Sequence, residues 1–449
     1  MVDVKRRRSR KRHDLSVWMN GRLVGTWTVR EHAPPKFQYA DDWIKSKAGR
    51  VLSLSLPFQA GNSPHEGAVV ENFFENLLPE NRDIRERLQH KFGTGSARAF
   101  DLLAEIGRDC VGAVQILPEG STPEGWDQIQ SEAMSDEQVE KALNNAVSNK
   151  LPGQADEDFR ISIAGAQEKT ALLWRDGGWH KPLGATPTTH IFKLPLGLVG
   201  NMRADLSTSV ENEWMCSKLM AAYGLEVAHC DYKVFGESKA LIVERFDRKK
   251  SGQGEYFLRL PQEDMCQAMG VSSATKYEAD GGPGIQQIME LLRGSSHHEH
   301  DRRSFFKAQI LFWILAATDG HAKNFSIFHE RKGPYRMTPL YDVLSAWPII
   351  GKGANHLQWQ DAKLAMAFRT KNAHYELSYI QRRHFNGVAA KLGLGESAED
   401  IINEILLATP DVIETVQGML PEGFPVQVAD SILQGVSKSV EKLKSMPVA

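Results

Sequence analysis

A short polar turn between apolar segments, late in the chain, constrains the fold more than any other feature. The turn runs from Asp319 to Asn324 and has the sequence DGHAKN. It follows the apolar run 305–316, whose length fits a buried helix, and two strand-like runs within 325–337 then lead to Asp342. This order predicts a helix, a polar turn and a hairpin, with polar side chains at the turn and just past the hairpin.

The residue types and spacing at this turn suit phosphoryl transfer. That reaction needs neutralised phosphate charge and an aligned hydroxyl more than covalent help from the protein. Asp319 is the candidate for a carboxylate that stays free of metal and accepts the hydroxyl proton. Asn324 and Asp342 offer the hard oxygen atoms that Mg²⁺ prefers. The alternatives are an ordinary turn at Asp319 and a strand cap at Asn324, because this spacing also occurs by chance.

Three weaker features come earlier in the chain. A small-residue turn at 162–170 lets backbone amides approach phosphate oxygens, although it is not a Walker motif. Lys193 lies within an apolar strand, either as a partner of phosphates or as an edge or snorkelling residue. A helix at about 207–223 offers Glu211 and Glu213 as partners for this lysine, and spacing alone leaves that choice open.

A buried-type strand at 240–247 completes the set as a candidate hinge, where backbone groups would contact adenine. The chain thus has, in order, a phosphate loop, a lysine, a helical glutamate, a hinge, the polar turn and Asp342. Six weak features in this order arise by chance far less often than any one of them. A β-containing lobe followed by a helical lobe agrees with the same interpretation.

Length and patterning divide the chain into four parts. A chain of 449 residues exceeds a typical single domain. Residues 1–13 form a basic tail, interpreted as disordered, with a contact to nucleic-acid phosphates as the alternative. We expect an N-terminal α/β subdomain over 14–150, a small lobe over 151–254 and a mainly helical lobe over 255–449. The predicted fold class is therefore α+β.

The N-terminal part is predicted in more detail but carries no recognisable chemistry. Asn20-Gly21 between apolar residues predicts a hairpin. The alternation at 51–56 predicts a half-buried strand. Further patterns predict helices at 69–78, 84–90, 100–106 and 135–147, and a strand at 111–117.

Composition narrows the class of protein. The formal net charge of −2 does not favour a nucleic-acid binder by bulk charge. We find no apolar stretch of about 18 residues, so a membrane is not an expected partner. The four cysteines are scattered without a CxxC pair, which indicates a reducing, cytoplasmic environment.

Longer strings resemble the HipA family of serine/threonine kinase toxins. They are residues 159–170, Leu258–Gln267, Asp280–Gly284 and Thr318–Asn324, and the similarity extends over nearly the whole chain from about Ser16. The resemblance implies a bilobal kinase like the phosphatidylinositol-3/4-kinases, preceded by an α/β subdomain. The basic tail lies outside the family pattern.

The resemblance also implies roles for individual residues. Asp319 would be the catalytic base, and Asn324 and Asp342 would hold Mg²⁺. Ser162 matches the serine that the family autophosphorylates, and Glu213 becomes the expected partner of Lys193. The residues expected to bind ATP are Ala164, Gly165, Ala166, Gln167, Glu168, Lys169, Lys193, Glu244, Arg245, Phe246, His321, Lys323, Asn324, Tyr341 and Asp342.

Partners and substrate follow from the same resemblance. The family's toxins pair with the DNA-binding antitoxin HipB, and the complex represses its own operon at operator DNA. The family's substrate is glutamyl-tRNA synthetase, whose phosphorylation mimics starvation and promotes growth arrest and persistence. Two alternatives remain: a small-molecule kinase, and a non-catalytic co-repressor scaffold that contacts DNA through the basic tail and Arg382-Arg383. The presence of Asp319, Asn324, Asp342 and Lys193 argues against the scaffold.

Overall fold

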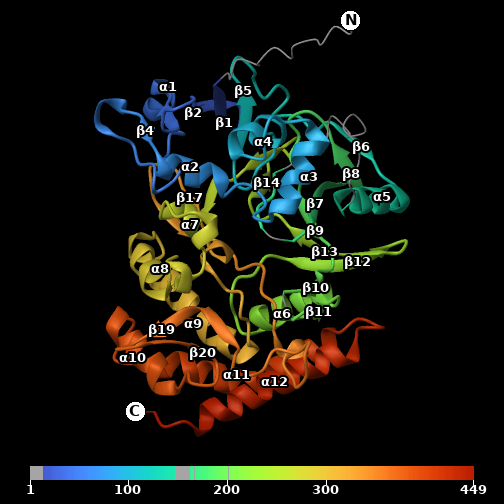
Figure 1. The fold of residues 1–449 in the computed structure, drawn as a ribbon, viewed down its shortest axis with the longest axis vertical. Coiled ribbons are helices and arrows are strands. Elements are labelled where there is room, and N and C mark those ends of the chain that lie inside the picture. Colours follow the sequence, from blue (N-terminus) through green and yellow to red (C-terminus); the bar gives the residue numbers. More distant parts are fainter. Residues whose placement is uncertain (1–13, 148–161, 166, 201, 449) are drawn as a thin grey trace, which may run out of the picture.

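A five-stranded antiparallel sheet organises the N-terminal part of the computed structural model, which describes residues 14–147, 162–165, 167–200 and 202–448 (Figure 1). The basic tail therefore lies outside the described residues. The turn at Asn20 and Gly21 joins the first two strands, and both residues have positive φ angles, as the predicted hairpin requires. The strands, in spatial order, are β4 (His65–Glu66), β3 (Lys36–Tyr39), β2 (Arg22–Thr28), β1 (Leu15–Met19) and β5 (Val114–Pro118).

Short helices pack against this sheet and enclose an apolar core. Trp27 of β2 stacks on Phe74, with the two ring centroids 3.8 Å apart. The helices predicted at 69–78, 84–90 and 100–106 are confirmed. The four helices are α1 (Asp41–Lys45), α2 (Ala68–Glu75), α3 (Arg82–Phe92) and α4 (Ala99–Ile106).

The strand predicted at 51–56 is wrong. The amide of Leu52 donates to the hydroxyl of Tyr39 at 2.6 Å, and the amide of Leu54 donates to Oε1 of Glu263 at 2.8 Å. Side chains from distant elements thus satisfy the backbone groups that a neighbouring strand would otherwise pair. Leu52 and Leu56 are buried, so the apolar positions are real, but they anchor a loop.

A six-stranded antiparallel sheet forms the second block. Helix α5 (Asp136–Val147) covers it, with Val139 and Leu143 packed in one core with Phe192 and Phe235. Because β6 pairs with β8, residues 131–147 pack with the following block rather than with the N-terminal subdomain to which they were assigned. The strands, in spatial order, are β12 (Cys230–Phe235), β13 (Ser238–Glu244), β9 (His190–Lys193), β7 (Lys169–Arg175), β8 (Gly178–Pro182) and β6 (Ser131–Ala133).

Smaller elements complete this block and link it to the next. Helix α6 (Ser209–Ala222) confirms the helix predicted at about 207–223 and ends before Gly224, whose φ is 83°. Two short hairpins follow the sheet strands: β10 (Gly197–Val199) with β11 (Ala204–Leu206), and β14 (Arg248–Lys250) with β15 (Phe257–Arg259).

The third block is mainly helical and surrounds helix α9 (His298–Leu315), which lies among the other helices in the lower half of Figure 1. Every residue from Phe305 to Leu315 is buried, which confirms the helix predicted at 305–316. No helix in the described ranges is both long and apolar enough to span a membrane. The other helices are α7 (Met265–Ala268), α8 (Ile285–Leu291), α10 (Arg382–Leu392), α11 (Glu399–Met419) and α12 (Val426–Ser445).

Five short strands accompany these helices. Strand β17 lies between β16 and β18 in a three-stranded antiparallel sheet, so the hairpin predicted after the polar turn is confirmed. The strands are β16 (Gln262–Asp264), β17 (Ser326–His329), β18 (Tyr335–Met337), β19 (Lys363–Arg369) and β20 (Ala373–Glu376). The overall fold is mixed α and β.

A buried ion network joins the N-terminal subdomain to the second block. Asp109, just after α4, accepts hydrogen bonds from Arg248 at 2.9 Å and Arg259 at 3.2 Å. Arg245 bonds Asp247 at 2.8 Å and also lies 3.3 Å from Asp109. Burial alone would raise the pKa of Asp109, but the surrounding guanidinium groups hold it well below its ordinary value. The network therefore depends on every carboxylate staying charged.

Replacing Asp109 with Asn tests this dependence. The variant leaves three buried guanidinium groups with one carboxylate, and breaking such a pair costs roughly 3–5 kcal/mol. Urea unfolding should show a loss of that size. The matched control is Asp136→Asn, which removes the exposed partner of Lys233 and should change stability by less than about 1 kcal/mol. Equal stabilities for the two variants would contradict the role given to the network.

Candidate functional site

A cavity opens where the three blocks meet. The N-terminal subdomain contributes Asn76, Leu77 and Glu80, which no sequence motif indicated. The expected site residues that line the cavity are Ala164, Gly165, Gln167, Lys169, Lys193, Glu244, Arg245, Phe246, Asp319, His321, Lys323, Asn324, Tyr341 and Asp342. The structure thus gathers residues from distant parts of the sequence around one space.

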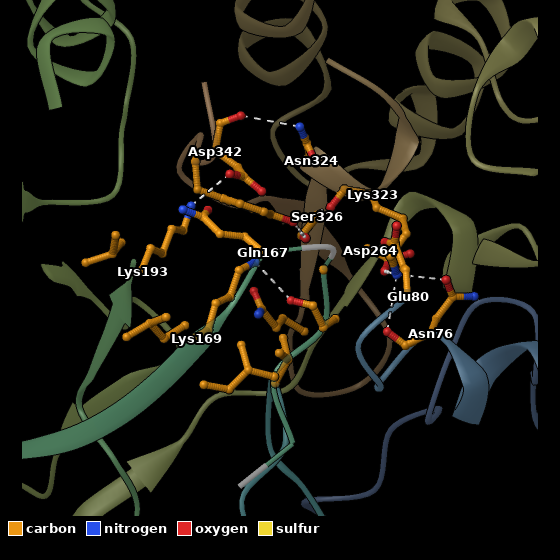
Figure 2. A pocket seen from close by; sticks show the side chains of 18 of the residues that line it. Asn76, Glu80, Gln167, Lys169, Lys193, Asp264, Lys323, Asn324, Ser326 and Asp342 are labelled. Carbon is orange, nitrogen blue, oxygen red and sulfur yellow. Dashed lines mark hydrogen bonds and ion pairs between the residues drawn. The ribbon is translucent and has the colours of Figure 1, made fainter. Parts of the chain in front are cut away.

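Lys193 is one of the residues that line this cavity (Figure 2). Strand β9 is an inner strand, between β13 and β7, so Lys193 is not an edge residue. Its Nζ lies 2.5 Å from Oε1 of Glu213 on α6 and 2.8 Å from Oδ1 of Asp342. Glu211 points elsewhere and pairs with Lys239. Glu213 is therefore the helical partner of Lys193.

The charged side chains around Lys193 shift one another's pKa values. Burial would lower the pKa of Lys193, but the two carboxylates raise it above its ordinary value. Burial would raise the pKa of Asp342, but Lys193 and Lys169 hold it well below its usual range. Burial dominates at Glu213, whose pKa is raised, and at Lys169, whose pKa is lowered. Asp342 is therefore a stable carboxylate next to cations.

The polar turn brings Asp319 and Asn324 to the lining of the cavity. Helix α9 ends at Leu315, and its C-cap residue Ala316 takes a left-handed φ of 51° that stops the helix before the polar turn. The side-chain nitrogen Nδ2 of Asn324 donates to the backbone carbonyl of Asp319 at 2.8 Å and to the backbone carbonyl of Asp342 at 3.3 Å. The side-chain oxygen of Asn324 has no partner among the described residues. The Asp319 side chain is 60% exposed and can be reached from outside.

The oxygen atoms at this end of the cavity fit a magnesium ion. Asp342 offers a carboxylate, and the fixed amide nitrogen of Asn324 leaves its oxygen as the second hard donor. No group of three or more His, Cys, Asp or Glu within the described ranges could hold a metal. A carboxylate and an amide are enough for Mg²⁺, which keeps several water ligands.

The small-residue turn is bonded to the N-terminal subdomain. Gly165 has a φ of 116°, its carbonyl accepts from the amide of Glu80 at 3.1 Å, and a Cβ there would lie 2.3 Å from Nζ of Lys169. Glycine is therefore required at this position. Ser162 is fully buried, and its Oγ donates to the carbonyl of Leu77 at 2.8 Å.

Two expected ATP-binding residues are engaged by other partners, and a third cannot be placed. Ala166 lies outside the described residues. Glu168 does not line the cavity and forms an ion pair with Arg87 on α3. Arg245 does line it, but its guanidinium is bonded within the buried ion network. Sequence spacing could not reveal these partners, because they come from the N-terminal subdomain or from local turns.

Two further expected residues are held by partners that sequence patterns could not predict. Nζ of Lys323 lies 2.6 Å from Oδ2 of Asp264 and 2.8 Å from Oδ1 of Asn76. Figure 2 shows these side chains together at one wall of the pocket. The hydroxyl of Tyr341 donates to the carbonyl of Lys323 at 2.8 Å. These bonds fix the wall of the cavity beside the polar turn.

The two arginines considered for DNA contact, Arg382 and Arg383, differ in exposure. Arg382 is buried at the start of α10, where its Nε lies 2.9 Å and its Nη2 2.5 Å from the two carboxylate oxygens of Glu399. Its charge is already neutralised within the helical block. Arg383 is exposed. Only the second of the two is open to solvent.

Comparisons with known proteins agree over most of the chain. Residues 161–413 match the family model for the HipA-like C-terminal domain, and residues 15–117 match that for the HipA N-terminal domain. A putative kinase, Y4mE of Sinorhizobium fredii, is 36% identical over 74% of this chain and 77% of its own length. The serine/threonine-protein kinase toxin HipA of Shewanella oneidensis is 30% identical over 68% of this chain and 69% of its own length.

A solved structure supports the fold. It is the Shewanella oneidensis complex of HipA, HipB and operator DNA, with a TM-score of 0.76. The match covers 96% of this chain and 97% of that chain at 24% sequence identity, so it establishes the fold alone.

Replacing Lys193 with Met tests the charge arrangement in the cavity. Without their cation, Glu213 and Asp342 repel each other, so their folded-state pKa values should rise above those of the unfolded chain. The folded variant then binds protons more tightly, and its stability should increase as the pH falls from about 8 to about 5.

Thermal unfolding across this pH range provides the measurement. In the wild-type protein, the raised pKa of Lys193 keeps its stabilising contribution present throughout the range. The exposed-site control Lys233→Met should follow the wild type. Parallel pH profiles for Lys193→Met and the wild type would contradict the arrangement.

Proposed function

The chain belongs to the HipA family, and from this membership we propose that it is an ATP-dependent serine/threonine protein kinase, the toxin of a toxin–antitoxin pair. One observation carries the proposal: Lys193 bridges Glu213 and Asp342 in the cavity that Asp319 and Asn324 also line. These are the parts that phosphoryl transfer needs. We further propose a bilobal arrangement like that of the phosphatidylinositol-3/4-kinases, with the cavity between the six-stranded sheet and the helical block.

The cavity supports a binding mode for ATP. Lys193 and Lys169 supply positive charge for the phosphates, and the turn at Gly165 has no side chain to keep them away. Phe246 follows β13 and lines the cavity, and its backbone amide and carbonyl have no hydrogen-bond partner among the described residues. These two groups are suited to bind adenine, as expected of a hinge.

Asn324 and Asp342 would hold Mg²⁺, which supplies neutralisation of the phosphate charge. Asp319 lies outside the Lys193 ion pairs and is exposed, so its carboxylate can accept the proton of an incoming serine hydroxyl. His321 stands 3.9 Å from it, and burial lowers the pKa of its imidazole. A neutral imidazole forms no ion pair with the Asp319 carboxylate.

The expected biological setting follows from the family. We propose a HipB-type antitoxin as partner and operator DNA as the target of the complex, which the assembled Shewanella oneidensis structure supports. We propose glutamyl-tRNA synthetase as the protein substrate in the cytoplasm, with growth arrest and persistence as the outcome. The scaffold alternative is weakened because the charged cavity residues remain paired around an open site.

Replacing Asp319 with Asn tests the catalytic base. The amide keeps the shape but cannot take the proton, and a general base contributes roughly 10²–10⁴-fold to the rate. Phosphate transfer to purified glutamyl-tRNA synthetase and growth inhibition on expression should both collapse. ATP affinity should stay close to the wild-type value. A variant with near-normal transfer would refute the assignment.

Self-phosphorylation of Ser162 is the second test of function. Its hydroxyl is buried against Leu77, so the segment must leave this position before phosphate can be added. A phosphate brings about −1.5 to −2 charges, which the buried site cannot accept. The modified segment should therefore stay displaced, and ATP affinity should fall.

Mass spectrometry after incubation with ATP measures the first step. Phosphate should appear on Ser162 in the wild type and be absent from the Asp319→Asn variant. An ATP titration of the phosphorylated protein measures the second step, with Ser162→Ala as the unmodifiable control. Unaltered ATP affinity after phosphorylation would rule out the switch.

A further inference from the structure

Tyr277 makes a contact with the candidate catalytic base that the proposed function does not use. Its hydroxyl donates a hydrogen bond to Oδ1 of Asp319. Its ring packs edge-on against the ring of His321, with centroids 5.1 Å apart and an interplanar angle of 86°. Tyr277 therefore touches two residues of the polar turn at once. It comes from a different segment, 272–284, which we call the flanking loop.

The flanking loop is fixed on both sides of Tyr277. Lys276 forms an ion pair with Glu80 of the N-terminal subdomain, and its carbonyl accepts from the amide of Ala322 at 3.4 Å. Glu278 accepts from the amide of Ala367 at 2.7 Å and from Arg369 at 2.7 Å, both on β19. Consecutive residues thus bond the N-terminal subdomain, the polar turn and the helical block.

The shape of the loop leaves little freedom for movement. A Cβ on Gly282 would lie 2.1 Å from the carbonyl oxygen of Thr275, so the two limbs of the loop approach as closely as glycine allows. The contacts of Lys276 and Glu278 hold Tyr277 on both sides, and its carbonyl accepts from the backbone amide of Gly282 at 2.9 Å. A hydroxyl on such a fixed ring can define the direction of a flexible acceptor.

We propose that Tyr277 is the positioning residue that orients the Asp319 carboxylate for proton transfer. Asp319 needs such a partner, because its side chain is 60% exposed and its carboxylate forms no ion pair with Lys or Arg among the described residues. An exposed carboxylate samples several rotamers, and only some direct an oxygen at the acceptor hydroxyl. A hydrogen bond to Oδ1 selects one of them.

The contact also leaves room for the reaction. A carboxylate has about four lone-pair sites on two oxygens, and Tyr277 occupies one of them on Oδ1. The other oxygen remains for the acceptor hydroxyl. Burial and the nearby Asp319 charge raise the pKa of Tyr277, so the phenol keeps its proton and remains a donor. Positioning thus requires no displacement of Tyr277 by the substrate.

The inference rests on the proposed function, in which Asp319 is the base. Tyr277→Phe removes only the hydroxyl and keeps the ring against His321. Loss of a hydrogen bond to a charged group lowers a rate by about 10-fold to 100-fold when the bond acts in the transition state. The rate constant for transfer at saturating ATP should fall by that factor, while the ATP concentration at half-maximal rate stays unchanged. A merely structural residue would alter both values together with stability.

The matched control is Tyr335→Phe. Tyr335 lies in the same block, and its hydroxyl donates to the carbonyl of Leu291 at 2.5 Å, away from the cavity. Both variants lose one phenolic hydrogen bond, so thermal unfolding of the full chains should show similar stabilities. The control should transfer phosphate at the wild-type rate.

A single-turnover assay with ATP radiolabelled at the γ-phosphate measures these rates. The label transferred to the protein itself and to added casein is summed. A Tyr277→Phe rate that equals or exceeds the wild type overturns the inference, and a higher rate would mean that Tyr277 blocks the acceptor. Combining Tyr277→Phe with Asp319→Asn should give no further loss, and an additive loss would also overturn it. Failure of the proposed function is distinguishable, because Asp319→Asn alone would then retain transfer.

Discussion

The ion group of Lys193, Glu213 and Asp342 is the interaction on which the site depends. Lys193 comes from an inner strand of the six-stranded sheet, Glu213 from the helix behind it, and Asp342 from the chain that follows the hairpin of the helical block. A buried lysine without counter-charges would lose its proton or leave the interior. The pairing therefore keeps Lys193 charged and keeps two blocks of the chain closed around one cavity.

The N-terminal subdomain is a structural part of the same site. Asp109 neutralises arginines that follow strand β13, and the ammonium of Lys323 donates to both Asn76 and Asp264. The backbone amide of Glu80 donates to the carbonyl of Gly165 in the small-residue turn. The bonds of Asn76 and Glu80 cross from the first block to residues that line the cavity, so the geometry of the candidate site depends on a domain in which no motif was recognised.

Order along the sequence predicted the central residues, because each comes from a segment with its own local pattern. Lys193, Asp319, Asn324 and Asp342 could be named before the structure was known, and all four line the cavity. Spacing alone left Glu211 and Glu213 open, because it gives no means of knowing which face of the helix meets Lys193. The family resemblance favoured Glu213, and the Lys193–Glu213 ion pair agrees with it.

Pairings between distant segments could not be predicted in the same way. The loop at 51–56 alternates like a strand, but its backbone bonds side chains that only the folded chain brings near. Arg245 was expected to bind ATP, but its guanidinium is paired with Asp109 and Asp247. Periodicity reports local structure and burial, whereas these bonds depend on how the three blocks meet.

The central claim is that the Asp342 carboxylate binds the Mg²⁺ ion that accompanies ATP. The magnesium dependence of ATP binding tests this claim most directly. Calorimetric titration with and without Mg²⁺ would compare the wild type with Asp342→Asn, which keeps the shape but loses the carboxylate charge. The account predicts that Mg²⁺ strengthens ATP binding to the wild type and that this gain is largely lost in the variant. An equal gain from Mg²⁺ in both proteins would contradict it.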